Sequence, residues 1–88
     1  MGIELLKKGR KKIDSIDSRI IGLISQRVSV GKSLGRIKKS KGLKIKDRPR
    51  EREVIENARA IAKHHDLEPE FVEELFRKIV KYTRDKQK

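Results

Sequence analysis

The stretch that decides the fold is LLKKGRKKIDSIDSRIIGLISQRVSVGKSLGRIKK, residues 5–39. Its hydrophobic residues recur at helical spacing and no proline interrupts it, so it predicts one long amphipathic helix, over about residues 4–39. At about 100° of rotation per residue, an apolar stripe falls within about 60° of Ile13 and comprises Leu6, Ile16, Ile20, Ile24, Gly31 and Leu34. Glycines within a helix cost about 1 kcal/mol relative to alanine, so those at positions 22, 31 and 35 suggest close approach of another backbone or of a ligand.

Three cations, Arg10, Arg27 and Lys38, fall within the same arc as the apolar stripe. Long charged side chains are normally kept off a buried face unless an anion meets them. Arg27 and Lys38 are three turns apart, or about 16 Å along the helix, so together they can bracket a small anionic ligand. The alternatives are solvated side chains for Arg10 and Lys38, and a structural salt bridge from Arg27 to Glu51 or Asp17.

The length of this helix predicts a second copy of the chain. Thirty-five helical residues extend about 50 Å, whereas a globule of 88 residues is only about 25–30 Å across. The rest of the chain is too short to cover such a helix. If two copies pair antiparallel, Arg10 of one copy reaches the region of Arg27 and Lys38 of the other.

The remainder of the chain predicts two shorter helices in the same single domain, residues 1–88. A basic loop containing Gly42 spans residues 39–46, and a helix over about 49–64 follows, with Pro49 in its first turn and Asp47 as its cap. A third helix over about 69–86 opens with Pro69. The expected fold class is therefore all-α, with three helices per protomer.

Polar residues extend the apolar faces of these two helices as well. Arg50 and Glu51 lie one turn before the apolar face of the second helix. In the third helix, steps of four from Ile79 lead to Thr83 and Gln87. Each helix thus carries polar groups on the side that should face its neighbours, which points to a shared site.

Composition narrows the possible partners. The chain is 43% charged with a formal net charge of +12, which favours an anionic partner such as nucleic acid, a membrane surface or a small polyanion. It has no cysteine, so disulfides and thiolate metal sites are excluded. It has only three aromatic residues, which weakens the case for a base-stacking platform. No apolar run approaches the roughly 18 residues of a membrane span, and we expect a cytoplasmic protein.

Taken together, these residues resemble the all-helical chorismate mutase family in its short, monofunctional form. The resemblance covers nearly the whole chain and rests on Arg10, IDSID at residues 13–17, Arg27, Gly35, Lys38, DRPRERE at residues 47–53, Thr83 and Gln87. It implies an intertwined antiparallel homodimer that converts the chorismate dianion to prephenate by an intramolecular Claisen rearrangement, in aromatic amino-acid biosynthesis. No metal or cofactor is implied for this reaction.

The resemblance also implies a role for each matching position. Arg10 of the partner subunit and Arg27 would bind the substrate carboxylates, and Thr83 would contact one of them where the family usually has serine. Lys38 would contact a carboxylate and the ether oxygen, to which Gln87 would also donate a hydrogen bond.

The remaining positions would bind the ring hydroxyl: Glu51 with the backbone near Asp47, supported by Arg50. Three other functions stay open at this point. They are isochorismate pyruvate lyase chemistry on the same fold, a non-enzymatic basic module that binds nucleic acid, and a helical dimerisation domain without activity.

Overall fold

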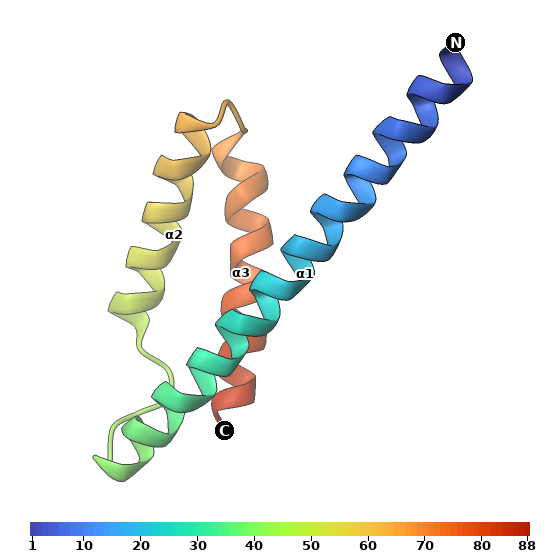
Figure 1. The fold of residues 1–88 in the computed structure, drawn as a ribbon. Helices are drawn as coiled ribbons and strands as arrows, with labels where there is room; N and C mark the ends of the chain where they lie inside the picture. The colour runs from blue at the N-terminus through green and yellow to red at the C-terminus, as the bar shows by residue number, and fades with distance from the viewer.

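The computed structural model describes all 88 residues and contains three α-helices and no strand. They are α1 (Gly2–Ser40), α2 (Arg48–His64) and α3 (Pro69–Gln87). The helices α2 and α3 form an antiparallel hairpin, and α1 crosses α3 (Figure 1). The prediction of an all-α chain with a long first helix is confirmed.

The protomer is extended because the N-terminal half of α1 projects beyond the hairpin (Figure 1). Its extents are 61 × 24 × 15 Å and its radius of gyration is 16.9 Å, against about 12 Å for a compact chain of this length. The helix α3 packs on both α1 and α2, whereas α1 and α2 do not pack on each other. None of the three helices is both long and apolar enough to cross a membrane.

Local sequence explains where the helices begin and end. Asp47 caps α2, its side chain accepting a hydrogen bond from the Arg50 backbone N–H at 3.1 Å. Gly42, with φ of +66°, terminates α1 in the left-handed conformation that glycine adopts at low cost. At the end of α2 the left-handed residue is Asp66, and the Leu67 N–H bonds the carbonyl of Ala62.

The small core lies between α2 and α3, and consists of Ile55, Ala58, Ala62, Val72 and Val80, with Phe76 packed against it. On α1, in contrast, only Gly31 and Gly35 are buried. The apolar stripe of this helix is uncovered within the protomer, since Ile13 is 58% exposed and Ile20 is 49% exposed. A single protomer therefore leaves its longest apolar surface in contact with solvent.

Ion pairs join the two helices of the hairpin at the surface. Arg59 of α2 donates to Glu73 of α3 at 2.8 Å, and Arg77 pairs with the same carboxylate at 2.7 Å. The hydrogen bonds from Arg77 and then Arg59 lower the pKa of Glu73 below its ordinary value.

The two buried glycines of α1 allow α3 to approach closely. A β-carbon at Gly31 would lie 2.3 Å from Thr83 Cγ2, and one at Gly35 would lie 3.0 Å from the backbone Cα of Gln87. Both positions thus require glycine for the observed packing. Gly22 differs, because a β-carbon there would meet nothing within 4 Å in the protomer.

Candidate active site

A cavity of about 250 Å³ lies where the C-terminal half of α1, the start of α2 and the end of α3 meet. This is slightly below the usual range for small-molecule sites, about 300–1,000 Å³. All three helices and the 41–47 loop contribute to its lining, which comprises Arg27, Val30, Gly31, Leu34, Lys38, Ile45, Asp47, Arg50, Glu51, Val54, Val80, Thr83, Arg84 and Gln87.

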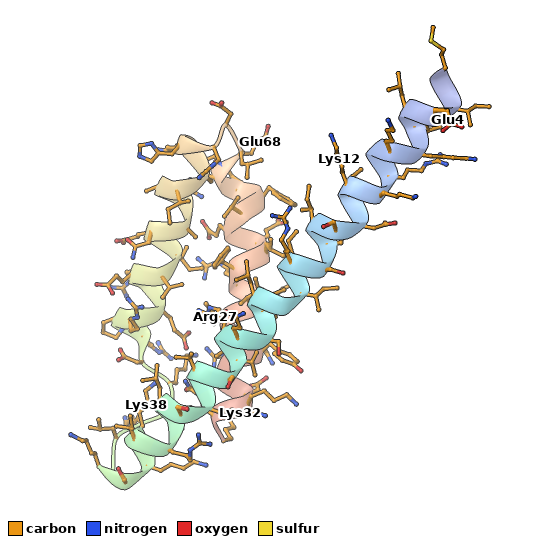
Figure 2. The ribbon with its side chains drawn as sticks, in the orientation of Figure 1. Glu4, Lys12, Arg27, Lys32, Lys38 and Glu68 are labelled. Carbon is orange, nitrogen blue, oxygen red and sulfur yellow. The ribbon has the colours of Figure 1, made fainter.

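Seven of the eight residues that the sequence suggested for a site line this cavity. They are Arg27, Lys38, Asp47, Arg50, Glu51, Thr83 and Gln87. The eighth, Arg10, is exposed on the projecting half of α1, about 25 Å along the helix from Arg27. Figure 2 shows Arg27 and Lys38 on the half of α1 beside the hairpin, whereas Lys12 lies on the projecting half. One protomer therefore brings together all of these residues except Arg10.

Arg27 is fixed by Thr83 at the crossing of α1 and α3. Its Nη1 donates to Thr83 Oγ1 at 2.6 Å, and this hydroxyl in turn donates to the Ile79 carbonyl at 2.8 Å. Burial, and then the nearby Arg50 cation, lower the pKa of the Arg27 guanidinium. The salt bridges to Glu51 or Asp17 that the sequence left open for Arg27 are not formed.

Lys38 closes the end of the cavity nearest the loop. Its Nζ donates to the Ile45 carbonyl at 2.8 Å, which ties the loop back onto α1. An ammonium group carries three N–H donors, so two remain for a ligand. The Ile45 carbonyl thus fixes the position of the Lys38 ammonium group and leaves two of its N–H donors free.

Gln87 lies in the last turn of α3 with its backbone against Gly35. Near it, Lys39 Nζ donates to the Lys88 carbonyl at 2.6 Å, which ties the end of α3 to α1. No side-chain hydrogen bond engages the Gln87 amide, whose N–H groups are therefore available in the cavity. The chain thus holds this amide by its backbone and leaves its donors to a ligand.

The start of α2 contributes both positively and negatively charged side chains to the cavity. Arg50 pairs with Glu53 on the exposed side of the helix, while its backbone N–H bonds the capping Asp47 carboxylate. Glu51 is paired across the hairpin with Arg84, whose Nη1 lies 2.7 Å and 2.8 Å from the two carboxylate oxygens.

Arg84 was not among the site residues that the sequence predicted. Steps of four from Ile79 led to Thr83 and Gln87, but the same step from the buried Val80 leads to Arg84, which was the available signal.

The electrostatics of the cavity suit an anion that carries more than one charge. Its lining includes four cations, Arg27, Lys38, Arg50 and Arg84, and two carboxylates, Asp47 and Glu51. The net charge of +2 is concentrated where water is partly excluded, and there it binds carboxylates more strongly than on an open surface.

Comparison with known proteins identifies the family. The family model described as chorismate mutase type II matches residues 9–88. A chorismate mutase of Methanocaldococcus jannaschii is 34% identical over 86 residues, covering 98% of this chain and 87% of that protein. A solved structure, a conserved hypothetical protein from Pyrococcus furiosus, superposes with a TM-score of 0.77 at 37% identity, covering 94% of this chain and 95% of that one.

Longer relatives carry the same unit as a small part. A bifunctional chorismate mutase/prephenate dehydratase of Escherichia coli is 27% identical over 71 residues, which is 81% of this chain but 18% of that protein. These comparisons favour neither the lyase nor the nucleic-acid-binding interpretation of the sequence. The chain belongs to the chorismate mutase type II family.

Proposed function

We propose that the chain converts chorismate to prephenate in the cavity at the junction of the three helices. The observation that carries this proposal is the convergence of Arg27, Lys38 and Gln87 on one partly enclosed cavity of net positive charge. Chorismate is a dianion that rearranges through an intramolecular pericyclic step. The protein therefore needs to select its compact conformer and to stabilise charge, without a nucleophile.

In this mechanism, Arg27 binds a substrate carboxylate through the N–H groups that Thr83 leaves free. An arginine has five N–H donors in a rigid fork, and one of them is used to bind Thr83 Oγ1. The hydroxyl of Thr83 donates its hydrogen bond to the Ile79 carbonyl, so it can donate to a substrate carboxylate only if that bond is broken. Its first contribution is to orient Arg27.

Lys38 and Gln87 act on the breaking bond. The two free donors of the Lys38 ammonium bind a carboxylate and the ether oxygen, while the Ile45 carbonyl fixes the position of Nζ. The Gln87 amide donates to the same ether oxygen. Negative charge develops on this oxygen as the carbon–oxygen bond lengthens, so donors that are already in place lower the barrier.

Glu51 accepts the hydrogen bond that the ring hydroxyl donates, and the backbone near Asp47 helps to hold this hydroxyl. Arg50 supports the arrangement from the first turn of α2. Together these contacts fix one end of the ring while the cations fix the carboxylates. The substrate is then held in the folded conformation from which it reacts.

The site is completed by a second copy of the chain. The exposed apolar stripe of α1 needs a cover, and an antiparallel partner helix would supply both this cover and Arg10 of the partner subunit. For that arginine to lie opposite the interval between Arg27 and Lys38, the twofold axis has to cross α1 at about residue 21. This places Ile20 and Ile24 of the stripe at the centre of the interface.

The test mixes purified protein with chorismate and follows both the loss of substrate absorbance and the formation of prephenate. We expect Lys38→Ala and Gln87→Ala each to lower kcat by about 10²–10³-fold. Lys32→Ala, on the same helix but outside the cavity, is the matched control and should keep its activity. An unmodified protein that does not accelerate the reaction over buffer would refute the proposal.

A further inference from the structure

The ion pair between Arg84 and Glu51 has no role in the mechanism above. It joins α3 to α2 across 33 residues of sequence, with one guanidinium nitrogen donating to both carboxylate oxygens, at 2.7 Å and 2.8 Å. The side chains are 19% and 25% exposed, respectively. In the Lys81–Asp85 pair within α3, in contrast, the side chains are 69% and 41% exposed.

Stability does not explain this pair well. Surface ion pairs contribute little, and a partly buried pair loses much of its Coulomb energy to the desolvation of both ions. The chain also joins α2 to α3 elsewhere, through Arg59 and Glu73. The position of the pair is more informative than its strength.

Arg84 and Glu51 together form the wall between two hollows. Both line the cavity described above, and both line an outer groove between α2 and α3 whose surface is mostly charged. Glu51 can therefore face a ligand in the cavity while its charge is balanced by a cation that is itself part of the wall.

We propose that Arg84 is a positioning residue that holds the Glu51 carboxylate for the ring hydroxyl and neutralises its charge. The inference rests on the proposed function. A free carboxylate in the wall would repel a dianionic substrate and would rotate among several conformers. Because each carboxylate oxygen has two lone pairs, Glu51 can accept from Arg84 and from the substrate hydroxyl at the same time.

The experiment is a double-mutant cycle with Arg84→Met and Glu51→Gln, measured as kcat and KM for chorismate. If Arg84 acts through Glu51, Arg84→Met lowers kcat/KM by about 10- to 100-fold in the unmodified protein. In the Glu51→Gln background, Arg84→Met should change kcat/KM by no more than about threefold, because the carboxylate that Arg84 orients is gone. Arg84→Lys, which keeps the charge, should restore part of the activity.

Arg77→Met is the matched control, since Arg77 lies on the same helix, pairs with a glutamate and lines only the outer groove. It should stay within about twofold of the unmodified protein. If Arg84→Met does not fold, the double variant is still compared with Glu51→Gln alone, and a change in kcat/KM of more than about threefold would overturn the inference. If the effects of the two substitutions on kcat/KM multiply as they would for independent residues, the inference is overturned.

The same measurements distinguish a failure of the role of Arg84 from a failure of the proposed function. An unmodified protein that is active, combined with a fully active Arg84→Met variant, removes the role of Arg84 and leaves the proposed function intact. An unmodified protein that does not convert chorismate removes both.

Discussion

Replacing Gly31 by alanine tests how closely α3 must approach α1 for the site to form. The added β-carbon would lie 2.3 Å from Thr83 Cγ2, about 1.2 Å or more inside the normal contact distance of carbon atoms. The methyl group has no easy escape, because Thr83 Oγ1 is held by both Arg27 and the Ile79 carbonyl. Rotation of this side chain would break both hydrogen bonds.

The expected magnitudes follow from these contacts. Overpacking costs about 1–3 kcal/mol, and alanine recovers about 1 kcal/mol of helix propensity. Gly31→Ala should therefore destabilise the fold by at most about 2 kcal/mol. Activity should fall further, by about 10²-fold, because relief of the clash displaces the hydroxyl that orients Arg27.

Thr83→Ser supplies the compensating change. Without the methyl group, the nearest atoms to a β-carbon at position 31 are Gln87 Nε2 at 3.7 Å and Thr83 Cβ at 3.8 Å, both ordinary contacts. The double variant loses about 0.8 kcal/mol of methyl burial and gains the helix propensity of alanine. It should therefore recover nearly the stability and activity of the unmodified protein.

The assays are chorismate turnover and urea denaturation of the single and double variants. Gly22→Ala is the matched control, because its β-carbon meets open space in the protomer. It should stabilise the helix by about 1 kcal/mol without loss of activity. A fully active Gly31→Ala variant, or a double variant no better than this single one, would refute the reasoning.

Three further predictions concern the partner, the end of α3 and the pH dependence. Inactive Arg10→Ala and Arg27→Ala subunits, mixed and allowed to exchange, should recover about one quarter of full activity, because half of the dimers would then have one intact site; no recovery despite proven heterodimers would count against shared sites. Gly35→Ala would place a β-carbon 3.0 Å from the Gln87 backbone, so kcat should fall by about 10²-fold, and normal turnover would argue against this contact. The pKa of Glu73 is lowered from 4.5 by its arginine partners, so its stabilisation is complete above about pH 4.5 and is lost as the pH falls through the folded-state pKa; Glu73→Gln should flatten the acid limb of stability measured by urea denaturation, and an unchanged limb would exclude this role.

The sequence predicted which face of each helix carries apolar residues and site residues, because hydrophobic periodicity depends only on local helix geometry. Prolines at positions 49 and 69 and the capping residue Asp47 mark the helix starts, and the structure shows Asp47 bonded to the backbone of Arg50. The glycine at position 31 suggested a close approach, and the structure identifies the neighbour as Thr83.

Pairing across helices was less accessible to sequence reasoning. Arg27 donates to Thr83 rather than to a carboxylate, and Glu51 accepts from Arg84, which was not among the predicted site residues. Such partners depend on how far one helix is shifted along its axis relative to the other. An axial shift of one residue exchanges one neighbour for another. Hydrophobic periodicity fixes the direction in which a side chain points from its helix, but it does not determine the axial offset between two helices.

The charged residues that line the cavity have an energetic cost for the fold. Burial and the cation of Arg50 lower the pKa of Arg27, which means that the fold holds this guanidinium where a positive charge is less favourable than in water. We expect a bound dianion to offset this cost, because its carboxylates would lie close to both cations. Only eight residues are buried in the protomer, so the second copy proposed above would add apolar burial along the exposed stripe of α1 and offset part of this cost.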